Sequence, residues 1–197
     1  MNATRQAHRP SMHLIDAIDG ITVPVTVSGP DRGRTIIMFE ETSRIVDTYD
    51  TVRERLHVAM FRTVVISARN GLTPKAVIAV LDQLKVVGGL IVADGVCGDL
   101  AWSLAAAHGA RFTGLVVIDS GHPAVPNVDG RVRDIHCPAV EVDTTVLVGG
   151  QASQAIARAS RRLVQGEFRL VELAGPRTSR HFTTQLAAEI VVRALSR

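Results

Sequence analysis

The sequence predicts an α/β fold, a mainly parallel sheet with helices on both faces. Hydrophobic residues make up 46% of the 197 residues but aromatic residues only 4%, so the core must be aliphatic, as in buried parallel sheets. Short apolar runs alternate along the chain with segments of helical periodicity. Each of these segments is long enough to cross between parallel strands, and such alternation is typical of α/β domains.

The elements follow in a regular order. The alternation Ile-Thr-Val-Pro-Val-Thr-Val at 21–27 indicates a half-buried strand, and Pro24 places it near a sheet edge because proline has no backbone donor. We therefore expect residues 14–27 to form an antiparallel edge. The apolar runs predict further strands at 35–39, 63–67, 90–93, 115–118, 146–148 and 168–173. The periodic segments predict helices at 46–58, 74–86, 98–108, 152–164 and 182–196.

Length and charge limit the protein class. The length fits one domain, which we assign to residues 13–197 behind a flexible N-terminal tail at residues 1–12. The net charge is +3, but the arginines are scattered, so we expect no nucleic-acid partner. No stretch has the length and apolarity of a membrane span or signal peptide, so we expect no membrane association. Two cysteines are too few for a disulfide framework, which favours a cytoplasmic protein.

Polar residues directly after the predicted strands form the candidate site. Ligands of parallel sheets bind beyond the carboxyl ends of the strands. The residues expected to line a ligand pocket there are Glu40, Glu41, Asp94, Gly95, Val96, Asp119 and His122. None of them shows tight metal-ligand spacing, so we expect neither a metal nor a cofactor.

Three segments resemble the α/β-hydrolase superfamily. Residues 89–123, GLIVADGVCGDLAWSLAAAHGARFTGLVVIDSGHP, are similar to its strand, nucleophile elbow, alanine-rich helix and following strand. ITVPVTVSGPDRGRTIIMFEE resembles its N-terminal hairpin and third strand, and FRLVELAGPRTSRHF the strand and loop that present its catalytic histidine. The resemblance covers roughly residues 14–195 and implies the α/β-hydrolase fold. Only about 20 residues stand where the family inserts a helical lid, so we expect a minimal or absent lid.

The catalytic positions depart from the family pattern. In the ungapped register Gly95 takes the nucleophile position and Ala152 lies near that of the acid, which leaves His181 alone of the triad. Glu40 and Glu41 replace the His-Gly pair whose loop supplies an oxyanion donor. A carboxylate about 5 Å from an oxyanion would raise the transition state by about 3 kcal/mol. That opposes the roughly 3 to 4 kcal/mol that one oxyanion-hole donor contributes.

These departures predict a pseudoenzyme that has lost serine hydrolase activity. It is expected to bind a small-molecule ligand or a protein partner at the carboxyl end of the sheet. The sequence is also compatible with a homo-oligomer. One alternative is hydrolysis of small esters or lactones by Cys97 with His181, because shifting the register gives a cysteine elbow like that of dienelactone-hydrolase-like enzymes. Asp94 and Asp99 flank the thiol, however, and favour a structural Cys97. A second alternative is cofactor-free acid/base catalysis by His181 with Glu40 or Glu41.

Overall fold

One eight-stranded sheet organises the chain in the computed structural model, which describes residues 10–18, 20–41, 47–68 and 71–196. The strand order is β1-β2-β4-β3-β5-β6-β7-β8. β1 and β2 pair antiparallel and β2 pairs antiparallel with β4, while every other pairing is parallel. The strands are β1 (Ser11–Asp16), β2 (Thr22–Ser28), β3 (Arg34–Glu41), β4 (Phe61–Ala68), β5 (Gly89–Asp94), β6 (Phe112–Ile118), β7 (Thr144–Val148) and β8 (Phe168–Glu172). The expected antiparallel edge and parallel sheet are confirmed.

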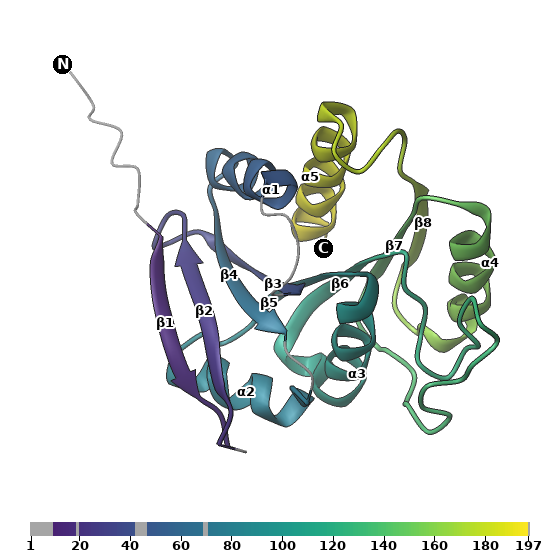
Figure 1. The fold of residues 1–197 in the computed structure, drawn as a ribbon, viewed down its shortest axis with the longest axis horizontal. Coiled ribbons are helices and arrows are strands. Elements are labelled where there is room, and N and C mark those ends of the chain that lie inside the picture. The colour runs from purple at the N-terminus through teal and green to yellow at the C-terminus, as the bar shows by residue number, and fades with distance from the viewer. Residues whose placement is uncertain (1–9, 19, 42–46, 69–70, 197) are drawn as a thin grey trace.

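Helices cover both faces of this sheet (Figure 1). They are α1 (Asp47–Val58), α2 (Pro74–Gln83), α3 (Gly98–His108), α4 (Gln151–Ser160) and α5 (Arg180–Leu195). α1 and α5 lie on one face, where their buried side chains form one core cluster with the strands. α2, α3 and α4 lie on the other face and form the larger cluster. The core is built mainly of Val, Ile, Leu and Ala, as the composition indicates.

Local capping moves several helix ends away from the predicted positions. α5 begins two residues earlier than expected because the Ser179 side chain accepts a hydrogen bond from the Phe182 amide at 3.1 Å. α2 ends three residues early, and Lys85 just beyond it has a φ of 56°, which a continuing helix does not allow. The predicted tail at residues 1–12 lies mostly outside the described residues, and β1 begins at Ser11.

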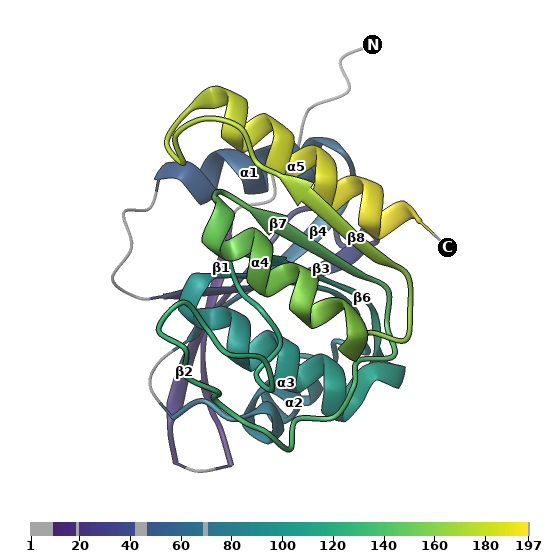
Figure 2. The same cartoon turned by 90° about the vertical axis from the view of Figure 1, so that its right-hand side faces the viewer.

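The connection between β6 and β7 contains no helix (Figure 2). It runs over α3, and Arg133 in this loop pairs with Asp99 of α3 at 2.8 Å. The expectation of a minimal or absent lid is therefore confirmed, and the carboxyl end of the sheet has no helical cover from this loop. Across the described ranges, no helix has both the length and the apolar character that crossing a membrane requires.

Candidate functional site

A tight turn joins β5 to α3 at the centre of the sheet. Gly95 has a φ of 52°, a conformation that residues with a side chain rarely adopt, and a short 3-10 helix at Gly95–Cys97 leads into α3. A Cβ on Gly98 would lie 2.3 Å from the Cβ of Ser120, so glycine is needed for α3 to pack against the end of β6. The predicted strand-to-helix turn at Gly95 is confirmed, and its apex has no side chain that could attack a substrate.

An ionic network lies beside this turn. The Arg177 guanidinium, in the loop after β8, donates hydrogen bonds to both Asp94 and Asp119. The Tyr49 hydroxyl of α1 donates to the same Asp94 oxygen that Arg177 contacts. Asp119 also accepts a hydrogen bond from the Gly149 amide at 2.7 Å. The network therefore ties α1 to the ends of β5, β6, β7 and β8, and Asp119 braces the loops at these strand ends.

The network is held by charge and hydrogen bonds together. Burial alone would lower the pKa of Arg177, but its hydrogen bonds and Coulombic attraction to Asp94 and Asp119 outweigh burial and raise the pKa. The Asp94 side chain is 6% exposed, whereas that of Arg177 is 40% exposed and also lies over the Phe182 ring at 5.9 Å. Arg177 thus stays cationic and neutralises a carboxylate that lies almost entirely inside the protein.

The two glutamates after β3 differ in their surroundings. Glu40 is half-buried and pairs with Arg53 of α1, which also pairs with Asp50. Burial raises the pKa of the Glu40 carboxyl, and nearby Asp50 adds to this while Arg53 opposes it. Glu41 is exposed and borders a cleft beside the turn at Gly95. Glu40 therefore belongs to an ion-pair cluster with α1.

His122 lies inside the protein. Its Nε2 lies 2.9 Å from the Pro138 carbonyl oxygen, which fits a donated hydrogen bond, and its Nδ1 accepts from the Ala124 amide at 3.2 Å. The ring meets the Trp102 indole edge to face, with centroids 5.4 Å apart. Burial lowers the pKa of His122. Both ring nitrogens have partners in the β6–β7 connection, so His122 holds that loop in place.

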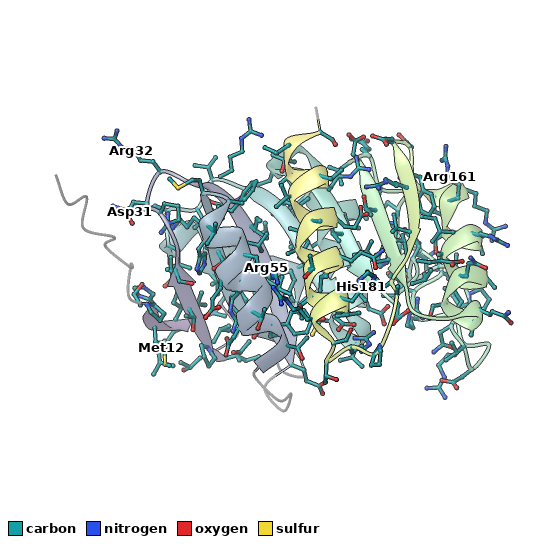
Figure 3. All side chains as sticks on the ribbon, turned by 90° about the horizontal axis from the view of Figure 1, so that it is seen from above. Met12, Asp31, Arg32, Arg55, Arg161 and His181 are labelled. Atoms are coloured by element: carbon teal, nitrogen blue, oxygen red, sulfur yellow. The ribbon has the colours of Figure 1, made fainter. Side chains whose placement is uncertain are left out.

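Cys97 and His181 start from opposite faces of the sheet. Cys97 is 5% exposed and packs in the core cluster of α2, α3 and α4. His181 is the second residue of α5, on the other face, and is exposed to solvent (Figure 3). Ala152, near the position of the family's acid, lies exposed in the first turn of α4. His181, which the resemblance implies for catalysis, therefore lies on helix α5. Arg177, in the loop between β8 and α5, is the residue that contacts Asp94 and Asp119.

The described residues at the carboxyl ends of the strands border two clefts. The first has a volume of about 410 Å³ and lies among the loops after β6, β7 and β8, where Arg177 and Asp119 border it. The second, which we call the elbow cleft, has a volume of about 450 Å³ and lies beside the turn at Gly95. The side chains that line the elbow cleft include Glu41, Leu72, Val96, Leu100, Arg133 and Asp134. Val96 and Glu41 are the expected pocket residues that border it.

Sequence reasoning missed Tyr49, Arg53 and Arg177, which partner the carboxylates at the strand ends. Tyr49 is the chain's single tyrosine, and this rarity is the signal in the sequence that could have indicated it. Arg177 lies in a loop with no periodic pattern. Over the ranges that the structure describes, no group of three or more His, Cys, Asp or Glu side chains is arranged to hold a metal ion.

Solved structures with the same architecture are numerous, although no family profile and no curated protein matches the sequence. Epoxide hydrolase A from Mycobacterium thermoresistibile superimposes with a TM-score of 0.73 at 9% identity, over 93% of this chain and 98% of that chain. A hydrolase from Pseudomonas aeruginosa PA01 gives 0.73 at 15% identity, over 99% and 100%. Dienelactone hydrolase from Anabaena variabilis gives 0.70 at 18% identity, over 96% and 100%. Together with the strand order and the turn at Gly95, these matches show that the chain has the α/β-hydrolase fold.

Proposed function

We propose that this protein binds a small ligand in the elbow cleft and does not hydrolyse esters through a nucleophile on the elbow. One observation carries the proposal: a cleft of about 450 Å³ opens beside an elbow whose apex is Gly95. Acyl transfer through this elbow requires a nucleophilic side chain at its apex. Arg177, in the network beside the elbow, is already paired with Asp94 and Asp119. Ligand binding therefore fits the site better than covalent catalysis.

The walls of the elbow cleft indicate the chemistry of the ligand. Leu72, Val96 and Leu100 supply apolar surface. Arg133 is already engaged, because it pairs with Asp99 at 2.8 Å and donates to the carbonyl of Gly121 at 2.9 Å.

Glu41 and Asp134 are exposed carboxylates on the same cleft. Among the described residues that line the cleft, the charge outside the Arg133–Asp99 pair is therefore negative. A small molecule with an apolar body and one cationic group fits this surface.

Binding can be tested with benzylamine and benzoate, which have similar size and opposite charge. We expect titration calorimetry to detect benzylamine and to show weaker or no binding of benzoate. Val96→Trp should block the cleft and abolish benzylamine binding. Val128→Trp is the matched control, because Val128 is exposed to a similar degree, 68% against 70%, and does not border the cleft. Equal binding by both variants would contradict the assignment of the cleft.

The cysteine alternative has a separate readout. Turnover of p-nitrophenyl acetate should be negligible, and any residual rate should survive both Cys97→Ser and His181→Ala. A rate lost in both variants would instead favour hydrolysis by these two residues. Cys97 is 5% exposed within the core cluster and His181 is exposed at the start of α5, which favours a structural Cys97. A cytoplasmic location also remains a proposal, which rests on the low number of cysteines.

A further inference from the structure

β1 presents an open edge of the sheet. It is the terminal strand and pairs only with β2 among the described strands. The Ala17 amide donates to the Ile21 carbonyl at 2.8 Å, so odd-numbered residues of β1 direct their backbone groups toward β2. Leu14 lies opposite Pro24, which has no backbone donor and suits a pair without hydrogen bonds. The backbone groups of Met12 and Leu14 therefore point outward, away from the sheet.

Among the described residues this edge has little of the usual protection, which is limited to Pro10 directly before β1 and to Gln83 of α2 at the Asp16 carbonyl. Sheet edges are normally shielded by lysine, proline, bulges or a covering element. β1 reads Ser-Met-His-Leu-Ile-Asp, and its Met12 and Leu14 side chains are 74% and 70% exposed (Figure 3 labels Met12). The opposite edge differs, because β8 is largely half-buried and its Arg169 pairs with Glu189 of α5. The exposed apolar middle of this edge, at Met12 and Leu14, favours a partner strand.

We propose that β1 pairs antiparallel with β1 of a second copy of this chain, about a two-fold axis at His13. An edge strand is its own complement under such an axis, because each donor meets the matching acceptor. In this register Met12 of one copy and Leu14 of the second copy exchange backbone hydrogen bonds, about four in total. Centring on Leu14 would use Asp16 instead, but the Asp16 carbonyl already accepts a hydrogen bond from Gln83 at 3.0 Å. The axis at His13 is therefore favoured.

Side chains support the same pairing. Met12 and Leu14 lie on the face of β1 opposite to buried Ile15, and the two-fold axis brings the two pairs together as four adjacent apolar side chains. One strand pair buries less than the 1,200 to 2,000 Å² of a typical stable interface, so we expect a dissociation constant of about 1 to 100 μM. The dimer should therefore form reversibly, with two eight-stranded sheets joined into one.

Sedimentation of the full chain tests the assembly. The wild-type should shift with concentration from the chain mass of 21.1 kDa toward twice that mass. Leu14→Lys should weaken the dimer by more than about tenfold, because it places two like charges beside the axis. Thr26→Lys is the matched control, since Thr26 lies opposite Met12 on the same face but one strand inward, and it should dimerise nearly as the wild-type does. A wild-type monomer at about ten times the upper expected dissociation constant would overturn the proposal.

A disulfide tests the register. In the proposed pairing His13 faces His13 of the second copy without backbone hydrogen bonds, with Cα atoms about 4.5 Å apart, a separation that a disulfide can bridge. His13→Cys should form a covalent dimer under mild oxidation. Ser11→Cys is the control on the same strand and face, because Ser11 would face Ile15 of the second copy. A covalent yield for His13→Cys no higher than for Ser11→Cys would refute the axis at His13.

Discussion

Removing the Arg177 guanidinium should destabilise the protein. Arg177→Met leaves Asp94 and Asp119 without their shared cation, while the methionine retains much of the packing against Phe182. Breaking a fully buried ion pair costs about 3 to 5 kcal/mol, whereas an exposed pair is worth about 0 to 1 kcal/mol. Asp94 is buried but Arg177 is 40% exposed, so solvent screening places the expected loss of unfolding free energy at about 2 kcal/mol.

Urea unfolding at pH 7 measures this loss. Arg180→Met is the control, since Arg180 is exposed three residues away and should change stability by less than about 0.5 kcal/mol. Asp94→Asn combined with Arg177→Met should be less damaging than the sum of the two single variants. Losses of the two single variants that simply add in the double variant would refute the ion-pair explanation.

Four further predictions concern the elbow and the buried titratable groups. Gly95→Ser should lower stability by about 1 kcal/mol through its positive φ and create no esterase activity in a p-nitrophenyl acetate assay. Gly98→Ala should cost about 2 kcal/mol in urea unfolding, because its Cβ collides with that of Ser120. Burial lowers the pKa of His122, so the unfolded chain binds a proton at this ring more tightly than the folded protein does. The free energy of unfolding should therefore fall as pH drops below about 6.5, by at most about 1.4 kcal/mol per pH unit. His122→Gln should flatten this slope in urea unfolding. Burial raises the pKa of Cys137 to about 11, so its alkylation by iodoacetamide at pH 8 should be slow until the protein unfolds.

The fold could be predicted because its signals are local. Apolar runs and helical periodicity each depend on a few neighbouring residues, and they place every strand and helix of the core within a few positions. Helix ends were less predictable, because they depend on single caps such as Ser179. The site was predictable only as the set of residues that follow the strands. Its central network joins Arg177 to Asp94 and Asp119 across 83 and 58 positions, and no local pattern encodes such contacts.

The turn at Gly95 shows why an elbow sequence is a poor guide to catalysis in this chain. The turn from β5 into α3 has a positive φ at Gly95, which glycine adopts without strain. Gly98 is required by a separate contact, the close approach of α3 to Ser120. Backbone conformation explains Gly95 and close packing explains Gly98, so neither glycine is evidence for a nucleophile at this turn. In a serine enzyme of this fold the strained apex presents the nucleophile; here the same geometry carries no side chain, and Arg177 fixes the neighbouring loops through Asp94 and Asp119. Catalytic function in this fold must accordingly be argued from the apex side chain and the residue that the loop after β8 brings to it, and in this protein those are a glycine and an arginine.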